Sequence, residues 1–251
     1  VEDPFLAEYI DRLGEASSRD LRVNLVDQAL NPRFRVGAML QRDLELVQRT
    51  AARYHVMHVS TGASVELIRQ AKADGLSVTA EATPHHLLLT DAACVTYDPN
   101  YKVNPPLRSA EDVEAVRRGV SDGTLDCLAT DHAPHAAEEK ELEFALAPFG
   151  MISLECALGL YVKALVDTGL LDWPGLLARM TVNPARLIGR PLGTLAEGRP
   201  ADVTLIDPKK RWTVKAGKFA SRSRNCPYDG WKLKARPVVT LVGGQVRYRL
   251  D

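Results

Sequence analysis

The sequence predicts an α/β protein that contains parallel strands of a (β/α) barrel and, after them, a small β module. A helix pattern followed by a strand pattern occurs three times between residues 36 and 131, which is typical of parallel sheets with helices outside them. Histidine and aspartate residues follow these strands, whose ends converge at the mouth of a barrel. From residue 191 onward, Gly, Pro and short alternating strands replace this pattern. We therefore divide the chain into residues 1–190 and 191–251.

Composition and charge limit the class of protein. Of the 251 residues, 45% are hydrophobic and 25% are charged, which suffices for a sizeable core and excludes a disordered chain. The 32 basic residues equal the 32 acidic ones in number, so no net field favours nucleic acid or an anionic membrane. The four cysteines form no Cys-x-x-Cys pair and are expected to be reduced and mostly buried. We expect a cytoplasmic protein that acts on a small molecule.

The helix-then-strand units precede residue 135. The first 31 residues contain a polar helix pattern and a short strand pattern at 21–26. Apolar residues at helical spacing then predict a helix over 36–53, and a strand follows at 54–59. Ser109 and Asp112 form a capping box at the start of the third helix. The second and third units are predicted at 64–73 with 76–83, and at 109–120 with 125–129.

The later elements begin with a charged surface loop at 136–147. A core helix is predicted next, at 151–166, where Glu155 and Lys163 make a membrane span unsuitable. Gly243-Gly244 is predicted to form a hairpin turn in the β module. The remaining helices are predicted at 173–180 and 183–188, and the strands of the module at 202–206, 212–214, 238–242 and 246–248.

The stretch from Leu128 to His135 ends an apolar strand in one carboxylate and two imidazoles, and all six histidines of the chain lie between residues 55 and 135. Asp131 and His58 both follow predicted strand ends, and imidazole plus carboxylate suits zinc with a position open for water. A His that binds a backbone carbonyl and an Asp that caps a turn explain the same residues equally well. If the first strand is extended throughout, His55 takes the face opposite His58 and is structural.

Other polar residues near the strand ends support weaker hypotheses. His85 and His86 are adjacent, so on an extended chain at most one faces a site, and a supporting or surface role is favoured for the pair. Asn104 precedes two prolines and either holds a substrate carboxylate or closes a turn. The run of charges at 138–143 is interpreted as a solvated face.

A set of motifs in a fixed order resembles the dihydroorotases of the cyclic amidohydrolase superfamily. In the barrel part these motifs are His58-Val59-Ser60-Thr61, Thr83-Pro84-His85-His86-Leu87, Asn104-Pro105-Pro106-Leu107-Arg108, Thr130-Asp131-His132-Ala133-Pro134-His135 and Ala147-Pro148-Phe149-Gly150. The tail adds Asn183-Pro184-Ala185-Arg186, Gly198-Arg199-Pro200-Ala201-Asp202-Val203 and Ser223-Arg224-Asn225-Cys226-Pro227-Tyr228. The resemblance extends from about residue 36 to the C-terminus.

The resemblance implies an amidohydrolase-type barrel with a small β-sandwich module, and zinc-dependent interconversion of N-carbamoyl-L-aspartate and dihydroorotate in pyrimidine synthesis. The residue that matches His58 binds one zinc ion in that family. The residue that matches Asp131 binds the other and is the general base and acid. The substrate is held at positions that match Asn104, His135 and the backbone of Phe149 and Gly150.

The same comparison predicts that this chain is the C-terminal half of such a barrel. The family's His-x-His on the first strand, its bridging carboxylate on the fourth and its His on the fifth have no counterpart here. We therefore expect the chain alone to bind metal poorly and to have little activity. A homodimer or a second polypeptide would complete the site. The alternatives are a related dihydropyrimidinase or allantoinase, and a non-catalytic scaffold for aspartate transcarbamoylase.

Overall fold

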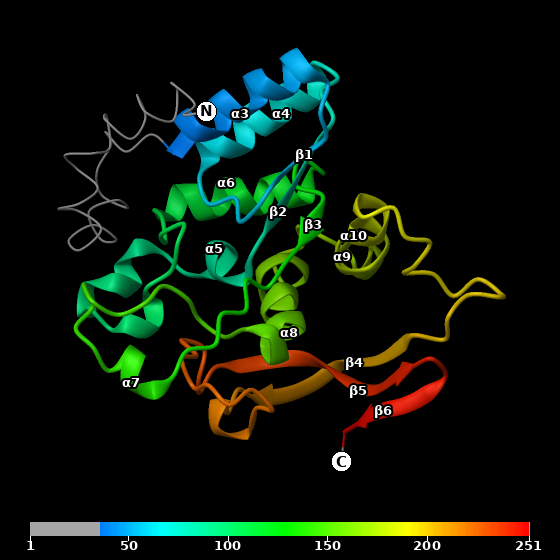
Figure 1. Cartoon of the computed structure of the whole chain (residues 1–251). Coiled ribbons are helices and arrows are strands. Elements are labelled where there is room, and N and C mark those ends of the chain that lie inside the picture. The colour runs from blue at the N-terminus through cyan, green and yellow to red at the C-terminus, as the bar shows by residue number, and fades with distance from the viewer. Residues whose placement is uncertain (1–35, 251) are drawn as a thin grey trace.

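Two three-stranded sheets organise residues 36–250, the part of the chain that the computed structural model describes (Figure 1). The predicted strand at 21–26 and the helix pattern around it lie outside this range. The first sheet is parallel and contains β1 (Tyr54–Val56), β2 (Val78–Ala82) and β3 (Cys127–Leu128) in that order. The second is antiparallel and contains β4 (Val203–Thr213), β5 (Lys232–Val242) and β6 (Gln245–Arg249).

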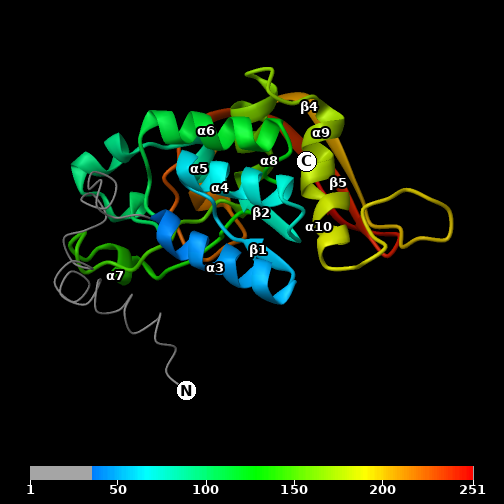
Figure 2. The same ribbon diagram turned by 90° about the horizontal axis from the view of Figure 1, so that it is seen from above.

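Three helices cover one side of the parallel sheet, as the helix-then-strand pattern predicts. They are α3 (Val36–Thr50), α4 (Gly62–Ala73) and α6 (Ala110–Ser121), and α4 lies between the other two in both views (Figures 1 and 2). The predicted cap of α6 is confirmed, because the Ser109 hydroxyl accepts a hydrogen bond from the backbone N–H of Asp112. Thr61 caps α4 in the same way. These caps satisfy amide groups that have no partner inside the helix.

The first strand is shorter than predicted, and this corrects the prediction for its histidines. β1 ends at Val56 and not at residue 59, because His58 has a φ of 53°, which lies in the left-handed region and is incompatible with an extended strand. The backbone still pairs beyond this point, since Val59 N–H donates to Glu81 O. The alternation of faces therefore stops before His58, and His55 is not directed away from it.

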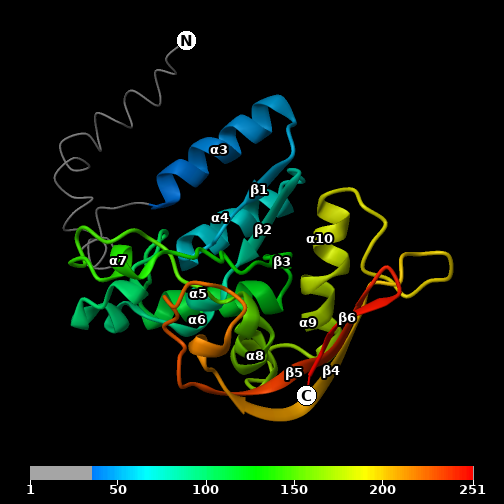
Figure 3. The same cartoon turned by 60° about the horizontal axis from the view of Figure 1, so that its bottom comes forward.

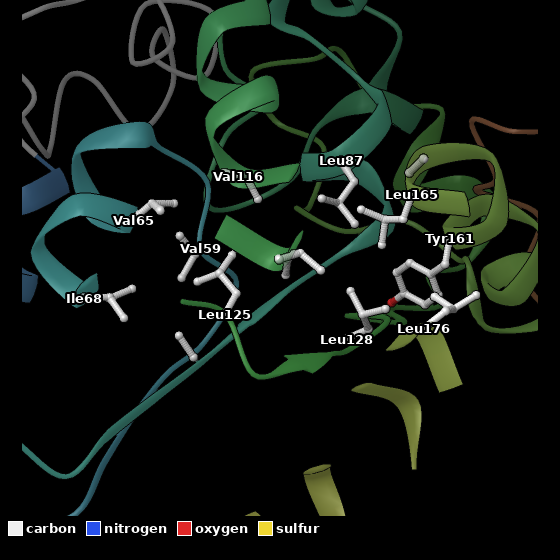
Figure 4. Close-up of a cluster of buried hydrophobic side chains, with 14 of the residues drawn as sticks. Val59, Val65, Ile68, Leu87, Val116, Leu125, Leu128, Tyr161, Leu165 and Leu176 are labelled. Carbon is white, nitrogen blue, oxygen red and sulfur yellow. The ribbon is translucent and has the colours of Figure 1, made fainter. Parts of the chain in front are cut away.

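An apolar core fills the space between the parallel sheet, its covering helices and the helical segment after residue 156 (Figure 4). β2 is the central strand and the most buried one, with Ala80 and Ala82 fully buried. Branched side chains from α4 and α6 pack against it, and Tyr161 and Leu165, from the helical segment after residue 156, extend the cluster next to Leu87. The labelled members of this core are Val59, Val65, Ile68, Leu87, Val116, Leu125, Leu128, Tyr161, Leu165 and Leu176.

The helix predicted at 151–166 begins later than expected and is not uniform. Residues before Ser153 are extended, since Ile152 N–H donates to Asn225 O and Ala133 N–H to Met151 O. The helical segment therefore starts with a 3₁₀ turn, η3 (Leu154–Cys156). It continues as α8 (Ala157–Tyr161) and ends in a π-helical turn, η4 (Val162–Val166). Backbone pairing with distant residues, which no local pattern encodes, decides where this helix begins.

The remaining helical elements are short. The predicted loop at 136–147 contains α7 (Ala137–Lys140), and Lys140 is buried, so the interpretation of residues 138–143 as a solvated face is wrong at that position. The others are α5 (Pro84–Leu88), η1 (Asp91–Thr96), η2 (Pro99–Tyr101), α9 (Trp173–Met180), α10 (Val182–Leu187) and η5 (Ala216–Lys218). No helix within residues 36–250 has the length and apolar character needed to cross a bilayer.

The antiparallel sheet packs against α8, on the opposite side of the molecule from α3 (Figures 1 and 3). A Cβ atom at Gly159 would lie 3.0 Å from Leu233 Cδ1, so helix and strand approach closely. The strands predicted at 202–206 and 212–214 are one strand, β4, with irregular pairing in its middle. The predicted hairpin at Gly243-Gly244 is confirmed. Of the expected sandwich, residues 36–250 supply one sheet.

All four cysteines are buried free thiols, as predicted. Three of them, Cys94, Cys156 and Cys226, belong to a second apolar cluster that also contains Leu160 and Leu233. This cluster contains residues from both sides of residue 190, so the barrel part packs directly against the C-terminal sheet. The division after residue 190 therefore remains a prediction from the sequence.

Tyr161 provides a test of how the helical segment is fixed to the sheet. Its fully buried hydroxyl group donates a hydrogen bond of 2.7 Å to Ala129 O, just after β3. Tyr161→Phe keeps the ring and leaves that carbonyl without its partner, so we expect the free energy of unfolding in urea to fall by about 1–2 kcal/mol. Tyr248→Phe, at an exposed position on β6, is the matched control and should change it by less than about 0.5 kcal/mol. Equal effects would contradict this account.

Candidate active site

Five titratable side chains meet where the parallel strands end. We call this group, which contains His55, His58, Glu81, His85 and Asp131, the strand-end cluster. His58 follows β1, and its Nε2 atom lies 3.5 Å from Asp131 Oδ1, after β3. The Nε2 atom of His85, at the start of α5, lies 3.7 Å from the other carboxylate oxygen of Asp131, Oδ2. The predicted proximity of His58 and Asp131 is therefore confirmed.

Glu81, on the central strand, contacts two histidines at once. Its Oε1 atom lies 2.9 Å from His58 Nδ1, an ion pair without the alignment of a hydrogen bond, and its Oε2 atom lies 3.2 Å from His55 Nε2. Burial raises the pKa of the Glu81 carboxyl, but the two histidines outweigh burial and hold this pKa at about 2. Glu81 is therefore a carboxylate at neutral pH. The only sequence signal for it is an acidic residue inside an otherwise apolar strand.

His55 belongs to the strand-end cluster, contrary to the prediction that it takes the face opposite His58. In addition to Glu81, it contacts the Thr79 hydroxyl through Nδ1 at 2.8 Å. The contact of His58 with Glu81 raises the pKa of His58 above its usual value, although desolvation acts in the opposite direction. One carboxylate thus orients two imidazole rings, and the Nε2 atom of His58 is directed toward Asp131.

Asp131 has a strained backbone and an altered acidity. Its φ is 47°, in a region that non-glycine residues seldom adopt. Burial raises the pKa of the Asp131 carboxyl and nearby Glu81 raises it further, whereas His58 lowers it, and the net change is upward. The side chain keeps 24% of its surface exposed. It is therefore a more basic carboxylate than usual and remains accessible to solvent, which suits a group that accepts and donates protons.

His85 and His86 are both buried, so the surface alternative for this pair is wrong. They lie on a helical turn and not on an extended chain, and only His85 faces Asp131. Neither ring nitrogen of His85 has a hydrogen-bond partner within residues 36–250, and burial lowers its pKa well below the usual value. His86 Nε2 donates to Pro105 O at 3.0 Å. His85 is thus a neutral imidazole beside the proposed proton carrier.

A second group forms around Gly150. The Nε2 atom of His135 donates a hydrogen bond of 2.8 Å to Phe149 O. Gly150 has a φ of 130°, and a Cβ atom there would lie 2.6 Å from Ala133 Cβ and 3.1 Å from His135 Nε2. The structure therefore brings His135, Phe149 and Gly150 together, and only glycine fits at position 150.

Asn225 connects this second group to the C-terminal sheet. Its Nδ2 atom donates to Ala133 O at 2.9 Å and to Gly150 O at 3.2 Å, and its Oδ1 atom accepts from His135 N at 3.4 Å. Asn225 is buried and lies between β4 and β5. One amide side chain from the C-terminal region thus fixes three positions around Gly150. This role was not predicted from the sequence, because it depends on contacts between residues that are at least 75 positions apart in the chain.

Asn104 and His132 take other positions. Asn104 is exposed, and its side chain has no hydrogen-bond partner within residues 36–250. Its neighbours are fixed, because Lys102 O accepts from Gly150 N at 2.8 Å and Pro105 O accepts from His86. His132 Nδ1 lies 3.3 Å from the backbone N–H groups of Ser153 and Leu154, so it has a structural role.

The described residues do not complete a metal site. His58 and Asp131 have the donor types that zinc takes, but a catalytic zinc ion requires three protein ligands. Within residues 36–250, no group of three or more His, Cys, Asp and Glu residues is arranged to hold a metal ion.

Comparison with known proteins places this geometry in a family. Residues 28–247 match the model of the amidohydrolase family. The chain belongs to the amidohydrolase family. It is 54% identical over 208 residues to a protein named dihydroorotase from Pelotomaculum thermopropionicum, a match that covers 83% of this chain and 49% of that relative. A dihydroorotase of Syntrophus aciditrophicus is 46% identical over 220 residues, with 88% and 51% covered.

Solved structures of this amidohydrolase family show the fold. An L-hydantoinase (dihydropyrimidinase) from Arthrobacter aurescens matches 98% of this chain and 55% of its own, with a TM-score of 0.82 and 30% identity. A D-hydantoinase from a Bacillus sp. matches 96% and 55%, with a TM-score of 0.86 and 24% identity. The chain thus spans about half the length of the relatives that it matches. Its parallel sheet is part of the amidohydrolase barrel, and its antiparallel sheet is part of the accompanying module.

Gly150 provides a test of the second group. Gly150→Ala forces a side chain into a backbone conformation that costs about 1–3 kcal/mol and adds the clash with Ala133. Gly123, with a φ of 87° and no atom within 4 Å of the added Cβ, carries the backbone strain alone and is the matched control. We expect Gly150→Ala to lower the free energy of unfolding in urea clearly more than Gly123→Ala does. Equal losses would mean that the close approach at Gly150 is unimportant.

Proposed function

We propose that this chain carries the C-terminal part of a dihydroorotase active site. The reaction is the reversible cyclisation of N-carbamoyl-L-aspartate to dihydroorotate, in the cytoplasm and in pyrimidine synthesis. The observation that carries the proposal is the contact between His58, after β1, and Asp131, after β3. About half of the aligned residues of the chain are identical to those of proteins named dihydroorotase.

In this proposal, Asp131 is the proton carrier. In the hydrolytic direction, water attacks the ring amide carbonyl and gives a proton to the Asp131 carboxylate. The C–N bond then breaks, and Asp131 returns that proton to the leaving ring nitrogen, so that Asp131 is regenerated. The partial exposure of Asp131 and its contacts with His58 and His85 support this role. Neutral His85 and the His58 imidazole flank the carboxylate and limit its orientation.

We further propose zinc as the cofactor, with His58 and Asp131 as two of its ligands. The other ligands would come from outside residues 36–250. A bound zinc ion lowers the pKa of water, which increases the supply of hydroxide at neutral pH. The contact between Glu81 and His58 Nδ1 supports this proposal, since ring nitrogens opposite a metal commonly pair with a carboxylate.

Substrate binding is assigned to residues that can recognise a carboxylate. We propose Asn104, His135 and the backbone at Phe149 and Gly150 for this role. The exposed amide of Asn104 has no internal partner within the described residues. The close contact of Gly150 with His135 supports a shared binding surface.

Two other functions are less well supported. Hydantoin hydrolysis is suggested by solved structures named hydantoinase, but these are at most 30% identical in the comparisons above, whereas the named dihydroorotases are about 50% identical. A non-catalytic scaffold for aspartate transcarbamoylase would not require His58, Asp131 or His135, so the presence of all three is an argument against this function. A homodimer would be compatible with either function.

The proposal is tested by assaying hydrolysis of dihydroorotate by the chain alone and after mixing with a second polypeptide. This polypeptide comprises the part of the Pelotomaculum dihydroorotase that the chain does not match. We expect little activity from the chain alone and clear activity from the zinc-supplemented mixture. Asp131→Asn should reduce the activity of the mixture by at least about 100-fold, since it removes the proton carrier. Asp74→Asn, at an exposed helix end, is the control and should have no effect.

Two results would overturn parts of this proposal. Faster hydrolysis of hydantoin than of dihydroorotate by the mixture would favour the dihydropyrimidinase alternative. Full activity of the Asp131→Asn mixture would remove Asp131 from the reaction.

A further inference from the structure

Two lysines, Lys102 and Lys140, are buried beside the presumed substrate-binding backbone. Their side chains connect two segments of chain, residues 99–104 and residues 145–150. We propose that Lys102 and Lys140 are positioning residues that fasten these segments together and so hold the Phe149-Gly150 backbone in place for substrate. This inference rests on the proposed function, since that function gives Phe149 and Gly150 their role.

Lys102 binds the second segment through both its side chain and its backbone. Its Nζ atom donates to Ala147 O at 2.6 Å and to Ala145 O at 3.0 Å. Its carbonyl oxygen accepts from Gly150 N at 2.8 Å. Its ammonium group also lies 4.9 Å from the centre of the Phe149 ring, within the range of a cation–π interaction. One residue therefore contacts four positions of the 145–150 segment.

Lys140 bridges the same two segments from a third element. It is the last residue of α7, and its Nζ atom donates to Pro99 O at 2.8 Å and to Pro148 O at 2.8 Å. The two acceptors belong to different segments, so the ammonium group ties one directly to the other. Pro99 O also accepts from the backbone N–H of Lys102 at 3.1 Å, so Lys140 is a second donor to this carbonyl group.

Both lysines are buried as charged groups without a carboxylate partner in the described part of the chain, so apolar packing alone does not explain why lysine occupies these positions. Lys102 is 2% exposed and Lys140 is 8% exposed. Within residues 36–250, no carboxylate oxygen lies within 4.0 Å of either ammonium group. Burial without a paired charge is costly and lowers the pKa of both lysines, that of Lys140 to about 8. Methionine would fill the same space at less cost, so the hydrogen bonds to carbonyl groups are the feature that distinguishes lysine here.

Lys102 acts through other residues and is not itself a ligand of the substrate. Two of its three donors bind carbonyl groups, its ammonium group lies beside the Phe149 ring, and the residue is only 2% exposed, so it is not open to a substrate carboxylate. Its effect is transmitted instead through Phe149, whose carbonyl group accepts from His135. Release of the 145–150 segment would therefore disturb His135 and Gly150 together.

Amide hydrogen exchange of the chain itself tests the fastening directly. In Lys102→Met and in Lys140→Met, we expect the peptide that covers residues 145–150 to exchange on the order of 10-fold faster than in the unaltered chain. The peptide that covers α6 should be unchanged, which reports that the fold is intact. Lys209→Met, at an exposed position on β4, is the control and should leave both peptides unchanged. If one variant unfolds, the other provides the test.

Kinetics of the mixture with the complementary polypeptide test the positioning role. We expect Lys102→Met to raise the KM for dihydroorotate by about 10-fold and to change kcat less, because binding groups are displaced while the strand-end cluster is intact. Unchanged exchange in both folded variants would overturn the fastening, and faster exchange with an unchanged KM would overturn the positioning role. An inactive unaltered mixture would instead refute the proposed function, and the exchange result would still decide whether the lysines fasten the segments.

Discussion

The buried carboxylate of Glu81 is the constraint on which the arrangement of the strand ends depends. It lies on the central strand of the parallel sheet, where an unpaired charge would be costly. His55 and His58 satisfy it from the neighbouring strand, and this fixes both rings. Because the Nδ1 atom of His58 is occupied by Glu81, its Nε2 atom faces Asp131. The orientation of the imidazole beside the Asp131 carboxylate is thus set by Glu81, a residue that does not itself contact Asp131.

The group around Gly150, which we propose binds substrate, depends on a different set of contacts, and these come from outside the parallel sheet. Asn225, from the region between β4 and β5, contacts Gly150 and His135, while Lys102 and Lys140 bind carbonyl groups of the 145–150 segment. The antiparallel sheet is therefore part of the architecture of the site. This sheet also packs closely against α8 at Gly159, and this contact fixes it to the barrel part.

The sequence predicted the parts of the structure that local patterns control. Helical periodicity identified α3, α4 and α6, and polar residues after apolar strands identified His58 and Asp131. The sequence-based predictions were wrong where contacts between residues far apart in the sequence determine the local structure. The left-handed conformation of His58 brought His55 into the cluster, and pairing of Ile152 with Asn225 delayed the start of the helical segment. Glu81 and Lys140 looked like ordinary charged residues, because their burial depends on partners from other elements.

Zinc content is the measurement that tests the central claim most directly. The chain, mixed with the complementary part of the Pelotomaculum relative, would be dialysed without free metal and its zinc determined by atomic emission. The account predicts that the mixture retains zinc and that a His58→Asn, Asp131→Asn double variant, still folded by circular dichroism, loses most of it. Equal zinc in the variant and the unaltered mixture would contradict the assignment of His58 and Asp131 as ligands.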